Sequence, residues 1–161
     1  MAEGDENWET NSLKKMTIRK MTIEDYDNVY QLWITCAGMG LNNLDDSRKG
    51  IDKYLKKNPD TCFVAEENDE VIGAILAGHD GRRGFIYHTA VIPDYRKQGI
   101  ASKLVECAMD ALMSEGINKV ALVVFDRNEA GNVFWEKLGF TSRNDLIYRN
   151  KEIMRQVRID T

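Results

Sequence analysis

The residues best placed for chemistry lie in one run near the middle of the chain, from Val91 to Ser102. An apolar stretch, residues 85–92, stops at a proline, a short polar loop containing Gly99 follows, and apolar residues then recur at helical spacing. This pattern predicts a strand, a tight loop and a helix in direct succession. Such a turn points free backbone N–H groups and the positive end of a helix dipole at one place, which favours the binding of a phosphate group.

A second block of the sequence, Asn128 to Phe140, is typical of a capped helix. Asn128 is suited to begin the helix, apolar residues follow at helical spacing, and Gly139 is suited to end it. A strand-like run, residues 119–125, separates this block from the first one. The two blocks in this order are the strongest functional signal in the chain.

Both blocks resemble signatures of the GCN5-related N-acetyltransferases, and the chain is similar to the small single-domain bacterial type over about residues 16–151. The loop Arg96-x-x-Gly99-x-Ala101 resembles the R/Q-x-x-G-x-G/A loop with which that family holds the pyrophosphate of acetyl-CoA. The second block resembles the family signature N-x-x-A-x-x-(F/L)-Y-E-K-x-G-F.

The resemblance implies an α/β fold. Its mixed central sheet would be mostly antiparallel, would splay between the two strands flanking the central helix, and would carry helices on both faces. The residue pattern agrees, because strand-like and helix-like runs alternate along the chain. The expected strands are residues 16–21, 61–66, 71–78, 85–92, 119–125 and, as a closing strand, 146–151, and the expected helices are residues 22–37, 47–57, 102–114 and 128–138.

The resemblance also implies that acetyl-CoA is the co-substrate and indicates how the chain would hold it. The pantetheine arm would pair with the strand backbone at Ala90 and Val91, and Asn128 would hydrogen-bond to the arm. The side chains of Arg96 and Lys97 would offset phosphate charge, the alternative being ordinary solvated surface charge. The amides that would receive the pyrophosphate belong to Lys97, Gln98, Gly99, Ile100, Ala101 and Ser102.

Three side chains are candidates for the catalytic step. His88 lies on the strand before the loop, and histidine titrates near neutrality, so it is the first choice for the base that deprotonates an attacking amine. Tyr87 is the second choice. A structural role for either residue, or proton transfer through water, is the alternative. Trp135 stands where the family usually has a tyrosine that can protonate the departing thiolate, and an indole cannot act as a general acid.

The activity implied by the resemblance is transfer of an acetyl group from acetyl-CoA to a primary amine of a small molecule or a peptide, by direct attack. The acceptor would enter over the loop at residues 38–48. Asp45 and Asp46 in this loop would attract a cationic amine or would be exposed loop acids. A non-catalytic acyl-CoA-binding sensor module of the same fold is the alternative.

The composition favours a cytoplasmic enzyme. The 161 residues suit a flexible polar extension, residues 1–15, followed by one acetyltransferase domain, residues 16–161. The net charge of −4 argues against nucleic-acid and membrane-surface partners, and no apolar run is long enough to span a bilayer. Three scattered cysteines indicate reduced thiols, and no metal site is expected. A homodimer is left open.

Overall fold

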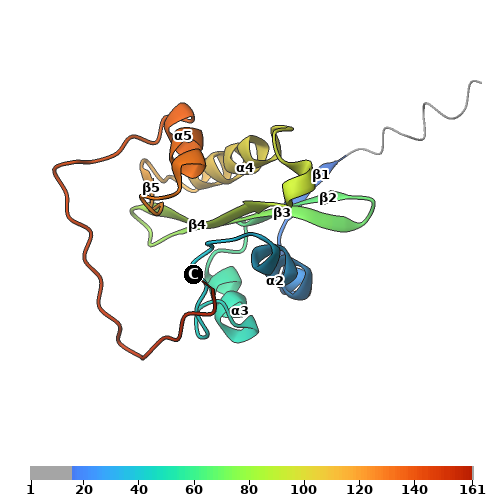
Figure 1. The fold of residues 1–161 in the computed structure, drawn as a ribbon, viewed down its shortest axis with the longest axis horizontal. Coiled ribbons are helices and arrows are strands. Elements are labelled where there is room, and N and C mark those ends of the chain that lie inside the picture. Colours follow the sequence, from blue (N-terminus) through green and yellow to red (C-terminus); the bar gives the residue numbers. More distant parts are fainter. Residues whose placement is uncertain (1–15, 161) are drawn as a thin grey trace, which may run out of the picture.

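A five-stranded mixed sheet lies at the centre of residues 16–160, the part of the chain that the computed structural model describes (Figure 1). The predicted extension, residues 1–15, lies outside the described residues. Neighbouring strands are antiparallel from β1 to β4, whereas β5 pairs with β4 in parallel. The α/β class and the mostly antiparallel sheet are therefore confirmed. The strands follow the chain order: β1 (Thr17–Lys20), β2 (Phe63–Glu67), β3 (Glu70–His79), β4 (Gly84–Val91) and β5 (Val120–Leu122).

Helices cover both faces of this sheet (Figure 1). On one face lie α2 (Tyr26–Thr35) and α3 (Arg48–Lys57), and on the other lie α4 (Ile100–Ser114) and α5 (Glu129–Lys137). Two short 3-10 helices, η1 (Ile23–Asp25) and η2 (Pro93–Tyr95), precede α2 and α4. Among residues 16–160, none of the helices has the length and apolar composition needed to cross a bilayer.

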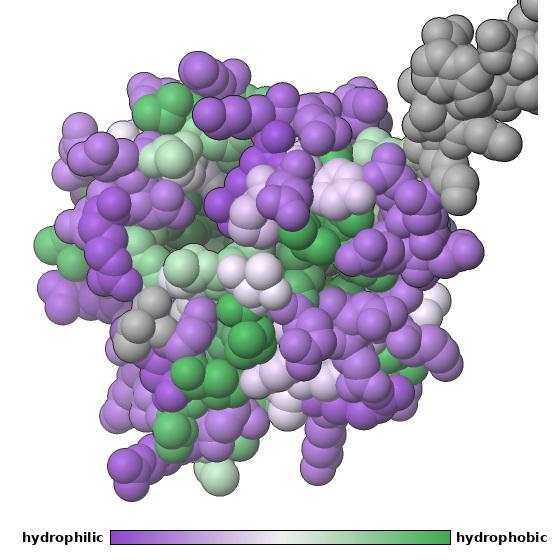
Figure 2. All heavy atoms as spheres, turned by 45° about the vertical axis from the view of Figure 1, so that its right-hand side comes forward, coloured by the Kyte–Doolittle hydropathy of each residue, from purple (hydrophilic) through white to green (hydrophobic). Residues whose placement is uncertain are grey.

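Each helix layer encloses its own hydrophobic core against the sheet. Strand β3 serves both cores, because neighbouring strand residues face opposite sides: Leu76 packs with Trp33 of α2, and Ile75 packs with Leu104 of α4. Apolar side chains are also exposed on the surface of the molecule (Figure 2). On the face that Figure 2 presents, apolar and neutral side chains gather in a hollowed band between hydrophilic margins.

The loop before α3 is held tightly against the first turn of that helix. The Ser47 hydroxyl accepts a hydrogen bond from the Gly50 amide at 3.0 Å and so caps the helix. A Cβ atom at Gly50 would collide with the carbonyl oxygens of Leu44 and Asp45. Glycine at this position therefore lets the loop pack closely, which fixes the place of the acidic residues that precede the helix.

The C-terminal part of the chain differs from the sequence prediction. The closing strand predicted for residues 146–151 is wrong, because this segment pairs with no strand of the described chain. Residues 141–155 leave α5, run outside the helix layers and return toward α3 (Figure 1). The tail after Glu152 forms no helix. Its end docks on the loop before α3, where the Ile159 amide donates to the Leu41 carbonyl at 2.9 Å and the Asp160 carboxylate accepts from the Met39 amide at 2.9 Å.

We expect Leu104→Ala to destabilise the protein, because Leu104 is fully buried between α4 and β3 and the change leaves a cavity. The expected loss is about 2–5 kcal/mol in the free energy of unfolding, measured by urea denaturation. Met113→Ala is the matched control on the same helix, where the side chain is 69% exposed. This control should change stability by less than about 0.5 kcal/mol. Equal losses in the two variants would contradict the packing assigned to α4.

Candidate active site

Strand β4 stops pairing with β5 partway along its length. The parallel pairing joins Gly84–Ile86 to Val120–Leu122 and goes no further, whereas the antiparallel pairing with β3 continues to Val91. The backbone of residues 87–91 therefore has no strand partner on its β5 side within the described residues. Backbone N–H and C=O groups need hydrogen-bond partners. This stretch, which is the splay predicted between the strands flanking α4, is thus open to a ligand that pairs like a strand.

A β-bulge in β4 begins where the pairing with β5 ends. Ala77 of β3 pairs with Ile86, and Ile75 pairs with Thr89, so two residues of β4 oppose the one residue between them on β3. Neighbouring side chains of a regular strand point to opposite faces. A bulge interrupts this alternation and re-aims the side chains it contains.

The bulge turns Tyr87 and His88 toward the same helix layer. The Tyr87 ring lies edge-on to Tyr54 of α3, with centroids 5.7 Å apart, and the His88 ring lies edge-on to Trp33 of α2, with centroids 4.9 Å apart. The two residues proposed from the sequence for the proton-transfer step therefore stand together on the α2/α3 side of the splay.

His88 forms a hydrogen-bonded pair with Asp46. Its Nε2 atom lies 2.7 Å from Oδ1 of Asp46, and the two side chains are only 14% and 5% exposed. The other carboxylate oxygen accepts from the Asn42 amide at 2.8 Å, and the Asp46 carbonyl accepts from the Tyr26 hydroxyl at 2.7 Å. Nδ1 of His88 makes no hydrogen bond to a described residue. Asp46 is thus a fixed, buried partner of His88 and not an exposed loop acid.

Tyr87 fits a hydrogen-bonding role better than the role of a base. Burial raises the pKa of its hydroxyl above the ordinary value, and the nearby Tyr148 and Asp45 raise it further. A phenol of this kind stays protonated at neutral pH. Tyr87 can therefore donate a hydrogen bond there, but it cannot take a proton from an ammonium group.

Two buried polar atoms beside the pair have no hydrogen-bond partner among residues 16–160. They are Nε1 of Trp33, whose ring contacts His88, and Oγ1 of Thr89, the next residue along β4. Buried polar groups are rarely left unpaired, but both atoms are enclosed by protein and neither is open to a substrate in this structure. The sequence analysis singled out neither residue.

The loop between η2 and α4 presents a row of free amides. Lys97 and Gly99 adopt left-handed backbone conformations, with φ of 63° and 78°. A Cβ atom on Gly99 would meet nothing within 4 Å, so the space in front of the loop is open. Six successive backbone amides find no hydrogen-bond acceptor within the described chain. They belong to Lys97, Gln98, Gly99, Ile100, Ala101 and Ser102. These amides and the helix N-terminus can hold a pyrophosphate without help from side chains.

Arg96 connects the loop to the end of β4. Its Nε donates to the Val91 carbonyl at 3.1 Å, and one terminal nitrogen lies 3.5 Å from Sγ of Cys36, at the end of α2. The guanidinium is therefore directed toward the strand end in this structure. Its contact with a phosphate group stays a prediction, as does that of Lys97.

Asn128 and Trp135 stand at the two ends of α5, on the other face of the sheet. The Asn128 side chain caps the helix by accepting from the Gly131 amide through Oδ1 at 2.9 Å, while its Nδ2 has no partner in the described chain. The Trp135 ring packs edge-on between Phe134 and Phe140, at centroid distances of 5.0 and 5.2 Å. Asn128 therefore keeps a free donor, and Trp135 serves as a packing residue in the α4/α5 layer.

Cys62 and Cys107 offer no activated nucleophile, because burial raises the pKa of both thiols. All three cysteines are free, and Cys36 and Cys62 are buried. Burial raises the pKa of the Cys62 thiol to about 12. Since the thiolate is the reactive form, neither of these two thiols is suited to form a covalent acyl-cysteine.

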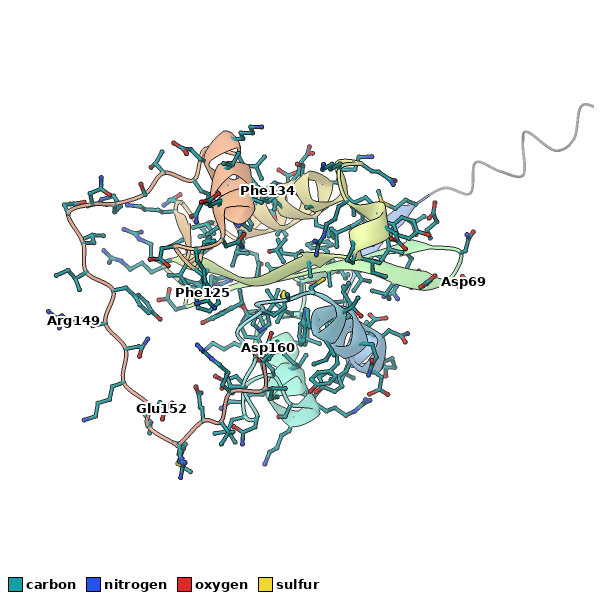
Figure 3. The ribbon with its side chains drawn as sticks, viewed as in Figure 1. Asp69, Phe125, Phe134, Arg149, Glu152 and Asp160 are labelled. Atoms are coloured by element: carbon teal, nitrogen blue, oxygen red, sulfur yellow. The ribbon has the colours of Figure 1, made fainter. Side chains whose placement is uncertain are left out.

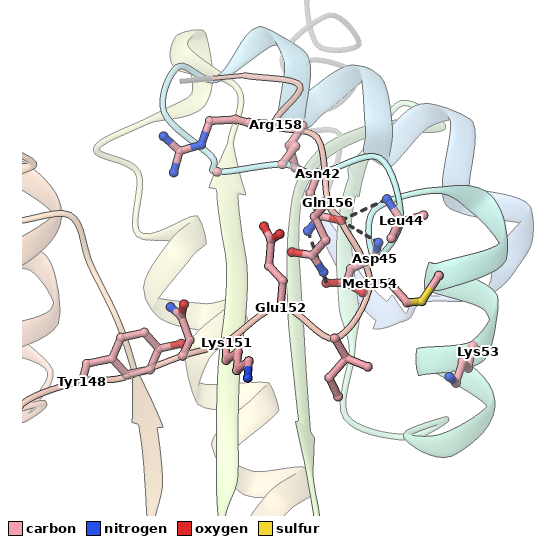
Figure 4. Close-up of a pocket in the computed structure, with 14 residues that line it drawn as sticks. Asn42, Leu44, Asp45, Lys53, Tyr148, Lys151, Glu152, Met154, Gln156 and Arg158 are labelled. Atoms are coloured by element: carbon pink, nitrogen blue, oxygen red, sulfur yellow. Dashed lines mark hydrogen bonds between the residues drawn. The ribbon is translucent and has the colours of Figure 1, made fainter.

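A cavity of about 740 Å³ lies beside the loop that carries Asp46 (Figure 4). The loop lines one side of it and the C-terminal segment lines the other. Acidic and basic side chains both line its wall, and Asp45 accepts a hydrogen bond from Gln156 at 2.7 Å. The cavity occupies the region, over residues 38–48, where an acceptor was expected to enter. Its charged lining residues are Asp45, Lys53, Lys151, Glu152 and Arg158.

Comparison with known proteins gives one consistent result. The model of the acetyltransferase (GNAT) family matches residues 26–140. An acetyltransferase of Sodalis glossinidius is 34% identical over 139 residues, which cover 86% of this chain and 96% of that protein. The PaiA N-acetyltransferase of Thermoplasma acidophilum, solved with coenzyme A, matches with a TM-score of 0.69 at 19% identity, over 80% of this chain and 91% of its own. The ribosomal-protein-S18-alanine N-acetyltransferase of Escherichia coli matches with a TM-score of 0.68 at 22% identity, over 80% and 79% of the two chains.

We expect Gly99→Val to weaken the binding of coenzyme A by about tenfold or more, which is about 1.4 kcal/mol. A β-branched side chain at this left-handed position would stand in front of the free amides. Gly116→Val at the other end of α4 is the control, because Gly116 also has a positive φ and open space around it. Calorimetry should find unchanged affinity in the control, and a similar loss in both variants would contradict the assignment of the loop.

Proposed function

The chain belongs to the acetyltransferase (GNAT) family, and we propose that it transfers the acetyl group of acetyl-CoA to a primary amine of a small molecule or a peptide by direct attack. The observation that carries the proposal is the buried His88–Asp46 pair, which stands at the β4 bulge beside the unpaired strand edge. A module that only binds acyl-CoA has no need of such a pair.

The residues present fit the co-substrate. The free amides of residues 97–102 would hold the pyrophosphate, and the open edge of β4 around Ala90 and Val91 would pair with the amide groups of the pantetheine arm. Nδ2 of Asn128 is free to donate a hydrogen bond to the same arm. When bound, acetyl-CoA supplies a thioester carbonyl as the electrophile.

His88 is the base of the proposed reaction. A neutral imidazole donates through one nitrogen and accepts through the other. With Nε2–H donating to Asp46, Nδ1 is the nitrogen that takes a proton from the ammonium form of the acceptor, directly or through one water. Asp46 holds the ring in this tautomer and balances the positive charge that the ring gains.

The acceptor site is the cavity beside residues 38–48. Asp45 and Glu152 would attract a cationic amine. Asp45 directly precedes Asp46, which is hydrogen-bonded to His88. The basic residues in the same wall would bind an acidic or carboxylate group elsewhere on the acceptor. A polyamine, an amino acid, an aminoglycoside and a peptide N-terminus are the four classes to compare.

An amine panel tests the proposed function directly. Release of the coenzyme A thiol from acetyl-CoA is followed for purified protein with a member of each acceptor class. We expect acceptor-dependent release, with the acetylated amine found by mass spectrometry. Binding of acetyl-CoA without release for any amine would support the acyl-CoA-binding module and contradict the enzyme assignment of His88.

His88→Gln should lower the turnover number by about 100-fold or more while leaving acetyl-CoA binding unchanged, because it removes the proton acceptor but keeps a polar side chain. Asp46→Asn should also lose activity and keep the binding of acetyl-CoA.

His79→Gln is the control for this experiment, because His79 is the only other histidine in the sequence and its nearest charged partner is Glu115, at 3.5 Å. Its turnover number should match that of the wild type. If His88→Gln keeps a turnover number close to that of the wild type, His88 is not the base.

Trp135→Phe should keep the turnover number within about tenfold of wild type, because the ring packs on Phe134 and Phe140 and supplies no acid for proton transfer. Trp135→Ala checks that the position is structural, and it should lower the free energy of unfolding by about 1–3 kcal/mol, because the ring is partly buried. A drop in turnover of about 100-fold in a stable Trp135→Phe protein would instead show that the indole takes part in the chemistry.

A further inference from the structure

A second cavity, of about 570 Å³, lies beside the turn that joins β3 to β4. Its size is within the range of small-molecule binding sites. It shares no lining residue with the cavity beside residues 38–48, so the two cavities are separate. Its wall comes from the ends of α3 and β3, the turn itself and the starts of β4 and β5. Residues 141–155 do not contribute to it, and Figure 3 shows Arg149 and Glu152 of that stretch away from the sheet.

Three aromatic rings form one side of this cavity. The centroid of the Tyr87 ring is 5.7 Å from that of Tyr54 and 4.7 Å from that of Phe85. Tyr87 is 55% exposed, and Phe85 is only partly buried. A flat apolar group placed against these rings would gain both burial and aromatic contact. The wall therefore favours a ligand with an aromatic or similarly apolar body.

Basic side chains stand around the aromatic wall. Lys57 ends α3, Arg83 directly precedes β4, and Lys119 directly precedes β5. None of these three side chains forms an ion pair with another residue of the described chain. The one acid in the wall, Asp80, accepts from the amides of Arg82 and Arg83, both at 2.8 Å, and these hydrogen bonds lower the pKa of its carboxyl group. The wall thus offers unpaired positive charge to an anion.

Asn58 adds a neutral donor to the same wall. The residue is only 5% exposed, and its Oδ1 accepts from the His79 amide at 3.0 Å. This bond fixes the orientation of the side-chain amide, and Nδ2 donates to no described residue. A Cβ atom at Gly78 would lie 2.6 Å from Nδ2, so glycine there lets the amide group pack against β3. Buried donors are rarely left unpaired, and an acceptor atom on a ligand would satisfy this one.

We propose that this cavity binds an organic anion, namely a carboxylate with an aromatic or similarly flat apolar body. The body would lie against Phe85 and Tyr87, and the planar guanidinium of Arg83 would bind the carboxylate through two nitrogens. Lys57 and Lys119 would add positive charge, which disfavours a cationic amine. A carboxylate is favoured over a phosphate, because a single negative charge costs less to remove from water beside an aromatic wall. This proposal does not depend on the proposed function.

Calorimetry with 3-phenylpropionate as the probe tests the ligand class. We expect saturable binding to the wild-type protein at millimolar concentrations. The neutral 3-phenylpropanamide and the cationic 3-phenylpropylamine should bind about tenfold more weakly or less, and inorganic phosphate should not displace the probe. Saturating coenzyme A should leave the affinity for the probe unchanged, because the loop before α4 does not line this cavity. Absence of saturable binding, equal affinity for the carboxylate and its amide, or displacement by coenzyme A or phosphate overturns the proposal.

Two variants of the turn test the position of the site. Arg83→Met should weaken the binding of 3-phenylpropionate by about tenfold or more, because it removes the charge and keeps an unbranched side chain. Arg82→Met is the matched control, since Arg82 is the exposed neighbour in the same turn and does not line the cavity. Both side chains are exposed, so both variants should stay folded by circular dichroism. Equal weakening in the two variants would show attraction by general surface charge and would overturn the assigned site.

Tyr87→Ala tests the aromatic wall separately from the charge. It should weaken the binding of 3-phenylpropionate and of 3-phenylpropanamide by similar factors, because both carry the ring that lies against Tyr87. Arg83→Met, in contrast, should affect the carboxylate alone. Unchanged binding of both probes to a folded Tyr87→Ala protein would contradict the placement of the ligand body against this wall.

Discussion

The early separation of β4 from β5 is the constraint on which the rest of this structure depends. A strand in the interior of a sheet normally satisfies its backbone groups on both sides, and unpaired groups are costly when they are buried. Here β4 keeps its β3 partner to Val91 but loses its β5 partner after Ile86, at the position where the bulge begins. The bulge, the open strand edge and the row of free amides before α4 follow one another along fifteen or so residues. These three features leave backbone groups without partners in neighbouring strands or helical turns, and in the proposed function they would receive a long, partly peptide-like co-substrate.

The acid–base pair depends on contacts that converge from distant parts of the chain. Asp46 can be buried because the Asn42 amide and His88 satisfy its carboxylate, and because Gly50 lets the loop lie against α3. The start of that loop is in turn bound by the carboxylate of Asp160, near the C-terminus. A tail that looks peripheral in Figure 1 therefore helps to position the residue that orients His88.

Local patterns account for what could be predicted from the sequence. The strand, loop and helix from residue 85 to residue 114, and the capped helix after Asn128, depend on periodicity and on glycine positions, and both are confirmed in place. The contact between Asp46 and His88 joins residues 42 positions apart, and no sequence periodicity indicates such a contact. The only hint in the sequence was the pair of adjacent acids before the cap of a helix. The bulge could not be predicted from the sequence, because it depends on how β3 and β4 pair with each other. The error at residues 146–151 has a different origin, because strand propensity reports what side chains favour and says nothing about whether the same subunit supplies a partner.

The two helix layers divide the chemistry between them. His88 and Asp46 stand on the α2/α3 side of the splay, beside the cavity where an amine would enter, whereas Trp135 packs in the α4/α5 layer. In the proposed reaction, removal of a proton from the acceptor takes place on the α2/α3 side, and the departing thiolate receives no proton from Trp135. The first step needs a base, because an ammonium has no lone pair, and the structure has a histidine held by a buried carboxylate there. The second step is less demanding, since a thiol with an ordinary pKa of about 8.5 leaves readily as its anion. An indole in place of a tyrosine on that side is thus compatible with catalysis, because the side that requires a titrating group is the side that has one.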